Sequence, residues 1–414
     1  MKLNLRWLFR DLVNQIWFTV ALYCLLGILV ALGAVLFKRF IPESFSSSIG
    51  ADAVDRMLGI IAASMLAVAT FSLSTMVQAF VSAGSGATPR AAQLVVEDRA
   101  AHQALATFIG AFVFSLVGLA ALSTGIYGSS GRLLLFVATV GVIVLIVVTL
   151  LRWIQRLSKL GRVVETIDQV EQVTRRAIEE RCQNPCLGAQ LLLDASSLRV
   201  PVLARSVGYV RRVDVAKLDA IAEEIGQDIY VEAAPGSFMT LDRALVVLDV
   251  DVEEAVRDRI AGCFMVGDQR SFEQDPRFGF VVLSEIASRA LSPAVNDPGT
   301  AIDVIGTMVR LLSVWTEGRV GPSPPAEYQR VHMRPISPHA LLNDAIVPIA
   351  RDGAALVEVG IRLQKGLKAL TRLGDWDLAE AARAQAHDAR TRADAALTFA
   401  GDRERIAAAA RLDG

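Results

Sequence analysis

The sequence lacks a charge excess of either sign, and it lacks the cysteines that a disulfide framework needs. Its 414 residues include 42 Lys and Arg and 43 Asp and Glu, which gives a formal net charge of -1. Proteins that bind nucleic acid through the phosphate backbone need clustered positive charge, so we expect no nucleic-acid partner. The four cysteines are too few and too scattered for a network of disulfides, and we expect free thiols.

Short catalytic and metal-binding motifs are also missing. The sequence contains no Walker-type glycine loop, no nucleophile elbow and no metalloprotease motif. Cys182 and Cys186 are four residues apart, but no second Cys/His pair has the spacing that would complete a zinc site. We expect the isolated histidines at the surface or at helix ends: His102, His332, His339 and His387. These absences predict a protein that is not an enzyme and that holds no metal and no cofactor.

Apolar residues, by contrast, are abundant. Hydrophobic residues make up 53% of the chain, and the mean hydropathy is +0.43. Four segments reach the ~20 residues that a helix needs to cross a bilayer: residues 16–37, 57–81, 104–128 and 133–154. The first exceeds the apolar stretch of a signal peptide, about 7–15 residues, and we expect it to be retained. Residues 1–155 are therefore predicted to form a transmembrane domain of four helices in a lipid bilayer.

Basic residues near the ends of these segments predict the orientation. Nine of them fall on the side that holds the N-terminus, and four fall on the other side, including Lys38 and Arg39. Cytoplasmic loops carry the excess of Lys and Arg, so both termini are expected in the cytoplasm. The strongly charged region that follows the fourth segment then lies inside the cell.

The second segment carries an unusual set of uncharged polar side chains. At 100° per residue of an α-helix, five of them project onto one arc of about 100°: Ser64, Ser74, Thr75, Gln78 and Ser82. One interpretation is a water-filled polar pathway, because uncharged oxygens can partly replace the hydration shell of an ion. The other is interhelical hydrogen bonding within a packed bundle. The sequence leaves both interpretations of these candidate pore-lining residues open.

The remainder of the chain is predicted to be a cytoplasmic α+β domain. Residues 156–197 have apolar positions at helical spacing, which predicts a connecting helix that continues the fourth membrane helix. Residues 198–252 combine strand-like runs with a Pro-Gly turn, which predicts a small β-rich module. Residues 253–414 are predicted to be mainly helical, ending in one long helix from Trp376 to Leu412. The predicted fold class is a multi-pass α-helical membrane protein with a C-terminal cytoplasmic α+β domain.

Two polar loops in this domain hold candidate ligand-binding or loop-anchoring residues: Arg270, Gln274, Asp275, Ser292, Asn296 and Asp297. Asp297 followed by Pro298 is typical of a helix start, where the carboxylate caps the first turn and proline takes its first position. The alternative is an anion or nucleotide phosphate bound at the N-terminus of that helix, with Arg270 and Asn296 contributing. Arg270 and Asp275 are also expected to pair with each other or to anchor their loop.

A set of residues between positions 267 and 301 matches a known family pattern: Gly267, Arg270, Gln274-Asp275, Phe278-Gly279, Ala287, the run from Ala290 to Pro298, and Thr300-Ala301. With these residues the chain resembles a bacterial family of predicted membrane proteins known as a domain of unknown function. The resemblance implies the same layout over nearly the whole chain, with several membrane helices, a Ser/Thr-rich second span and a cytoplasmic helical domain. It places the protein in the bacterial inner membrane and implies no activity.

Two functions are consistent with these features. The first is an oligomeric channel-like or transport assembly, a homo-oligomer in which the second membrane helix lines a polar pathway for ions. The second is a membrane-anchored sensory or scaffold protein whose cytoplasmic domain binds a small ligand or a partner near Arg270 and Asn296. The two differ in whether the membrane helices conduct.

Overall fold

The chain forms two compact units joined by one helix. A computed structural model describes residues 16–36, 51–96, 99–124, 128–157, 161–192, 200–319 and 324–411. The first unit is Met1–Thr166, and the second unit is Ile167–Gly414. The chain passes from one unit to the other within helix α7, Val163–Gln183.

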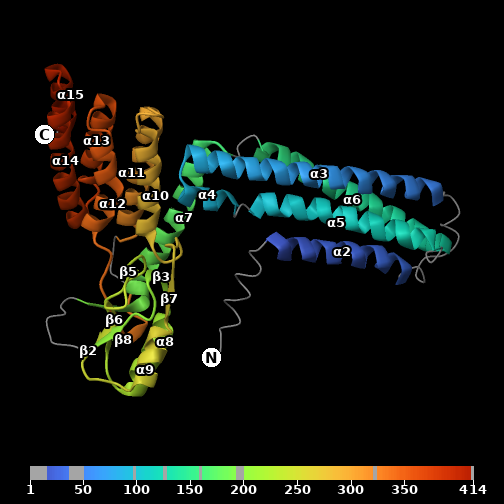
Figure 1. Cartoon of the computed structure of the whole chain (residues 1–414), viewed down its shortest axis with the longest axis horizontal. Coiled ribbons are helices and arrows are strands. Elements are labelled where there is room, and N and C mark those ends of the chain that lie inside the picture. Colours follow the sequence, from blue (N-terminus) through green and yellow to red (C-terminus); the bar gives the residue numbers. More distant parts are fainter. Residues whose placement is uncertain are drawn as a thin grey trace. The chain divides into compact units, whose positions relative to one another are not determined.

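The first unit is a bundle of apolar helices built around α5 (Figure 1). Its helices are α2 (Ile16–Leu36), α3 (Ala51–Gly86), α4 (Pro89–Val96), α5 (Arg99–Ser123) and α6 (Gly128–Leu157). Helices α2, α3 and α6 all contact α5. Half of the most apolar stretch of α5 is buried within the unit, against 28% for α3 and 17% for α6. Helix α5 is therefore the central helix.

Glycines allow the helices to approach α5 closely. A Cβ atom on Gly27 of α2 would lie 2.8 Å from the carbonyl oxygen of Gly110 on α5. A Cβ atom on Gly110 would in turn lie 3.0 Å from the carbonyl oxygen of Tyr23. Small residues at helix contacts are how membrane helices gain close van der Waals packing without a hydrophobic driving force.

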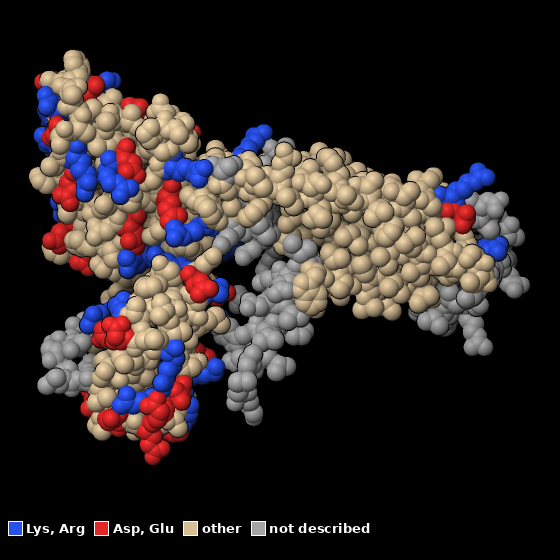
Figure 2. Space-filling view, in the orientation of Figure 1, with Lys and Arg blue, Asp and Glu red and all other residues tan. Residues whose placement is uncertain are grey.

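Three helices of the described residues are long and apolar enough to cross a membrane. They are Ala53–Ser82, Ala100–Ser123 and Gly131–Leu157, and α2 contributes a shorter apolar stretch, Trp17–Gly33. Figure 2 shows charged side chains gathered at the ends of this bundle, with an uncharged surface between them. The multi-pass helical part of the predicted fold class is therefore confirmed, although with three such helices rather than four.

In the second unit, the strands form two small sheets. The five-stranded sheet has the order β1-β8-β4-β6-β2, and the three-stranded sheet has the order β5-β3-β7. Their bounds are β1 Ala189–Leu191, β2 Val200–Leu203, β3 Gly208–Val213, β4 Ile229–Val231, β5 Phe238–Met239, β6 Ala244–Leu248, β7 Phe264–Gly267 and β8 Tyr328–Met333. Helix α8 (Val215–Ile225) packs on β4 and β8, with Leu218 fully buried.

Most helices of the second unit form one group on one side of the sheets (Figure 1). Besides α7, α8 and the short 3₁₀ turn η3 (Pro185–Gly188), they are α9 Glu254–Ala261, α10 Pro276–Ala290, α11 Pro298–Glu317, α12 Pro338–Asp352, α13 Val357–Leu370, α14 Trp376–Ala396 and α15 Ala400–Ala410. Helix α10 contacts α11 and α12, and α13 contacts α11, α14 and α15. The C-terminal α+β region of the predicted fold class is thus confirmed.

Several predicted element boundaries differ in the structure. Strands β1, β7 and β8 come from outside residues 198–252 and complete the two sheets. The connecting helix does not continue α6 directly, because Gly161, with φ of +80°, precedes α7. The predicted last helix is two helices, since the backbone is extended at Leu397 between α14 and α15. Hydrophobic periodicity alone does not predict that a helix is interrupted at a single residue such as Gly161 or Leu397.

Gly279 lies at a close contact between α10 and α7. A Cβ atom there would lie 1.9 Å from Thr174 Oγ1 on α7. Because overpacking a filled contact costs about 1–3 kcal/mol, Gly279→Ala should lower the melting temperature of the full-length protein in detergent. Gly141→Ala is the matched control, since a Cβ atom there meets nothing within 4 Å. Equal melting temperatures for the two variants would contradict the packing.

Candidate functional site

The structure places the five polar residues of α3 mainly on the outer surface of the described bundle. Ser64, Ser74, Gln78 and Ser82 are exposed, and Thr75 is half-buried. The opposite face of α3 packs inward and includes Leu58, Met65 and Ala69. The polar residues therefore face away from the interior of the bundle.

Ser64 and Thr75 form hydrogen bonds within α3, and Ser82 forms one with a carbonyl outside it. Ser64 Oγ donates to the carbonyl oxygen of Ile60 at 2.7 Å, and Thr75 Oγ1 donates to that of Ser72 at 2.9 Å. Ser82 Oγ donates to the carbonyl oxygen of Gly161 at 3.2 Å. The side chains of Ser74 and Gln78 have no hydrogen-bond partner among the described residues. Interhelical hydrogen bonds within the described bundle thus do not account for the polar arc.

A second feature of the same outer face was not singled out from the sequence. Gly59, Ala63 and Ala67 follow one another at intervals of four residues, and at 100° per residue they lie in line with Ser74 and Gln78. Ala63 and Ala67 are exposed, and a Cβ atom on Gly59 would meet nothing within 4 Å. We call these five residues the outer line of α3. Small residues at this spacing allow close approach of another helix.

The loop before α10 contains a buried ion pair. Asp275 is 2% exposed, and its Oδ2 accepts a hydrogen bond from Arg270 Nε at 2.8 Å. Asp275 also caps α10, because its Oδ1 accepts from the backbone N–H of Phe278 at 3.3 Å. Burial raises the pKa of Asp275, and the charge and hydrogen bonds of Arg270 oppose that shift. The pair is an internal contact, with little surface left for a ligand.

Neighbouring groups fasten this loop to the rest of the second unit. Gln274 Oε1 accepts from the backbone N–H of Val213 in β3 at 2.9 Å, and the buried Arg181 of α7 donates to the carbonyl oxygen of Gln274 at 3.0 Å. Gly236, with φ of +90°, fits against the ion pair, since a Cβ atom there would lie 2.3 Å from Asp275 Oδ2. Arg270, Gln274 and Asp275 therefore anchor the sheets to α7 and α10.

Ser292, Asn296 and Asp297 lie in a separate place, in the exposed turn between α10 and α11. Ser292 Oγ donates to the carbonyl oxygen of Arg289 at 2.6 Å, and Asn296 has a left-handed backbone with φ of +50°. Asp297 caps α11 by accepting from the backbone N–H of Thr300 at 3.1 Å. The 15 residues of α10, about 22 Å of helix, separate this turn from the Arg270 loop. Arg270 and Asn296 thus do not share one pocket.

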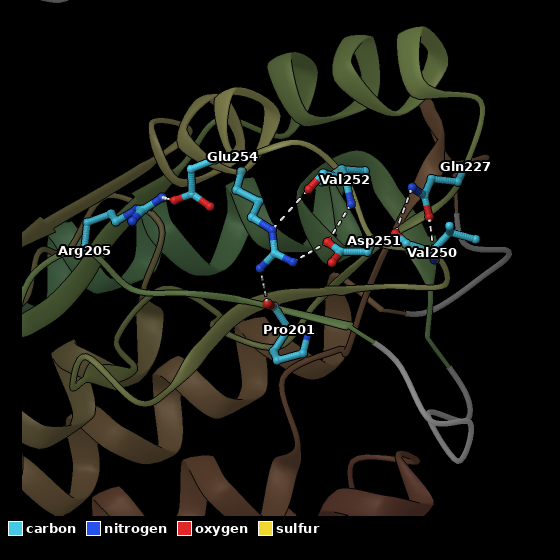
Figure 3. Close-up of polar contacts among 8 residues, drawn as sticks. Pro201, Arg205, Gln227, Val250, Asp251, Val252 and Glu254 are labelled. Carbon is cyan, nitrogen blue, oxygen red and sulfur yellow. Dashed lines mark hydrogen bonds and ion pairs between the residues drawn. The ribbon is translucent and has the colours of Figure 1, made fainter.

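Another polar cluster fastens the loop between β6 and α9 (Figure 3). Gln227 and the backbone of Val250 exchange two hydrogen bonds, at 3.0 and 3.2 Å. Asp251 Oδ1 accepts from the backbone N–H of Val252 at 2.7 Å and also binds Arg257. Arg205 pairs with Glu254 beside them. These contacts tie the loop to Gln227 and to α9, and α9 to Arg205, so their role is to hold the loop.

The described part of the second unit also has one shallow groove, and it holds none of the sequence-predicted residues. The groove has a volume of about 450 Å³ and lies between α10 and α12, where its lining includes Ser284, Asn343 and Pro348. The Ser284 hydroxyl is buried there without a hydrogen-bond partner among the described residues. Within the same residues, no three His, Cys, Asp or Glu side chains form a metal-binding group.

The cysteines and His102 complete the set of reactive side chains. All four cysteines are free, and burial raises the pKa of Cys263 to about 11. His102 was expected at the surface or at a helix end. It lies in the first turn of α5, which begins at Arg99, and it is 7% exposed, so it is at a helix end but buried.

Comparisons with known proteins give a family and no activity. The family described as "Predicted membrane protein (DUF2254)" matches residues 13–369. An uncharacterized protein of Mycobacterium bovis and one of Mycobacterium tuberculosis are each 31% identical over 121 residues, which is 28% of this chain. The matched stretch spans 23% of the length of each of these relatives. No solved structure matches the chain.

The two Asp-Pro helix starts, Asp275-Pro276 and Asp297-Pro298, form a matched pair for a stability test. Asp275→Ala leaves Arg270 without its buried partner, so it should destabilise the full-length protein by about 3 kcal/mol or more. Asp297→Ala removes only an exposed cap and should cost about 1 kcal/mol. Thermal unfolding in detergent measures both variants, and equal losses would contradict the difference in roles.

The loss of stability caused by Asp297→Ala should also depend on pH. Hydrogen bonds from the Thr300 side chain and backbone lower the pKa of Asp297. A carboxylate with a lowered pKa stabilises the fold above its ordinary pKa and stops doing so as the pH falls through the folded value. The difference between wild type and Asp297→Ala should therefore be full at neutral pH and shrink in acid.

Proposed function

Because the chain belongs to the family described as "Predicted membrane protein (DUF2254)", whose description names no activity, we propose a function from the geometry of its helices. The protein is an oligomeric, channel-like membrane assembly in which α3 lines a polar pathway. The observation that carries this proposal is the position of Ser74 and Gln78, exposed on the outer face of α3 without a partner among the described residues.

Lipid is a poor environment for such a face. Hydrocarbon offers no hydrogen-bond donor or acceptor, so an amide that faces acyl chains pays a desolvation cost of several kcal/mol. Two environments remove that desolvation cost. One is water in a pathway, and the other is the polar groups of a second helix. A homo-oligomer with α3 toward its axis supplies both, because each copy brings the same polar residues to the axis.

The outer line of α3 supports the same arrangement. Gly59, Ala63 and Ala67 leave a flat strip along the helix on the outer face. A second copy of α3 fits against this strip, and tight backbone approach is the main source of helix association in lipid. Ser74 and Gln78 follow further along the line, where the helices separate enough for water or ions to contact them.

We further propose the arrangement of the subunit in the membrane. Helix α2 is a fourth span, since its 21 residues reach about 31 Å of helix, close to the ~30 Å hydrocarbon thickness. Both termini lie in the cytoplasm of a bacterial inner membrane, in agreement with the nine basic residues on that side. The transported species is an ion or another small polar solute, and the protein is not an enzyme.

A second candidate function is a membrane-anchored sensory or scaffold protein. The groove between α10 and α12, with the unpartnered Ser284 hydroxyl in its lining, favours a ligand or partner on the second unit. Under this function the membrane helices only anchor the chain, and purified protein does not conduct.

Flux from proteoliposomes tests the pathway directly. Gln78→Leu replaces the amide with an apolar side chain of similar size. If the amide contributes as much as a hydrogen bond between membrane helices, about 1–2 kcal/mol, ion flux should change by about 5- to 30-fold. Val77→Leu is the matched control, because Val77 is an exposed apolar residue one position away. Folded wild-type protein without flux for several ions would favour the scaffold function instead.

The oligomer is tested by a substitution on the outer line. Ala63→Leu places a bulky side chain where a second α3 approaches, so it should shift the detergent-solubilised protein toward monomers in native mass spectrometry. Val144→Leu, at an exposed position on α6, should leave the distribution unchanged. Identical distributions for wild type and Ala63→Leu would place the interface elsewhere.

A further inference from the structure

The last residue of the polar arc contacts the chain segment that leads into α7. Ser82 Oγ donates a hydrogen bond to the carbonyl oxygen of Gly161 at 3.2 Å. Gly161 precedes the first residue of α7 by two positions, and α7 carries the chain into the second unit. One hydrogen bond thus joins the end of the polar arc to the connection between the units.

The contact requires glycine at position 161. Its φ of +80° lies in the left-handed region that glycine adopts without cost. A Cβ atom there would lie 3.4 Å from Ser82 Cβ and 3.5 Å from Ala79 Cα. The backbone of Gly161 is therefore seated directly on the surface of α3.

A second contact lies one helical turn further along α3. A Cβ atom on Gly86 would lie 3.2 Å from Val163 Cγ2, at the first residue of α7. Ser82 and Gly86 are four residues apart and share one face of α3. The start of α7 thus follows this face over a full turn and has a defined position on α3.

An ion pair braces the bend between α6 and α7. Arg156 in the last turn of α6 and Glu165 in the first turn of α7 approach to 2.6 Å. Their side chains are 27% and 20% exposed, so water screens the pair only in part. The ion pair joins α6 to the first turn of α7 on either side of Gly161 and so helps to hold Gly161 against α3.

We propose that this seat, formed by Ser82, Gly86, Gly161 and Val163, is the point at which the second unit regulates the α3 pathway. Helix α7 is continuous from Val163 to Gln183 and crosses the boundary between the units. A force on α7 from the second unit therefore acts first on the seat, where it shifts the Ser82 end of α3. The inference rests on the proposed function, since it names the regulation of that same pathway.

A reversible cross-link tests the seat in the full-length protein. A Cβ atom on Gly86 would lie 3.2 Å from Val163 Cγ2, and neither residue has a left-handed backbone, so this pair offers a cross-link that leaves Gly161 unchanged. Gly86→Cys combined with Val163→Cys should form a disulfide under mild oxidation, identified by mass spectrometry of the linked peptides. The oxidised protein should differ from the reduced protein by roughly 5- to 150-fold in proteoliposome flux, the range of a typical coupling between sites. The two single-cysteine proteins cannot form this disulfide, so they show the effect of the oxidant alone.

Each outcome has a definite meaning. A disulfide that forms without changing flux would overturn the regulatory inference and leave the pathway intact. A disulfide that does not form would also overturn it, because the seat would then not exist in the membrane. Absence of flux from the wild-type protein would overturn the proposed function itself, whatever the cross-link does.

Exchange of the bracing charges gives an independent test that needs no cysteine. Arg156→Glu and Glu165→Arg, made singly, place like charges at the bend and should change flux by up to about fivefold, as expected for a partly exposed pair. The double exchange restores opposite charges and should return flux to the wild-type value. Equal flux in all four proteins would contradict a role for the brace.

Discussion

The absence of hydrogen-bond partners in a bilayer is the constraint on which the first unit depends. Helices α2, α3 and α6 turn apolar faces outward, where no hydrogen-bond partner is needed. Helix α5 is packed against these three helices. The outer face of α3 does not meet this constraint within the described bundle, because Ser74 and Gln78 are exposed there. The same physics that lets the bundle fold therefore leaves these two polar side chains exposed on one face of α3.

The second unit depends on a different interaction, the buried pair of Arg270 and Asp275. A carboxylate that is 2% exposed is stable only when its charge is balanced and its oxygens are hydrogen-bonded. Arg270, the N-terminus of α10 and the close approach of Gly236 provide that environment. Since Gln274 and Arg181 extend it to β3 and α7, residues distant in sequence share one anchoring point. This explains a group of polar residues without assigning them a ligand.

Much of the architecture follows from the sequence through local rules. Long apolar runs indicated the membrane helices, and the alternating and turn-forming residues indicated the β-rich module. The Asp297-Pro298 pair indicated a helix start, and Asp275-Pro276 carries the same signal, although it was not recognised as a cap beforehand. Strands β1, β7 and β8 could not be assigned to the sheets, because their pairing joins residues far apart in the chain and leaves no periodic trace within either segment.

By itself, the sequence determined which residues are polar, which are small and at what spacing they recur on α3, because helical periodicity is a local property. Only the tertiary structure decided which face of that helix is outward. Small residues occur on both faces of α3, with Ala62, Ala69 and Ala79 buried and Ala63 and Ala67 exposed. Their positions depend on how α5 packs against α3, an interaction between segments that a single helix does not encode. The same packing placed Ser82 against Gly161, 79 residues away, and so joined the polar arc to the connection between the units.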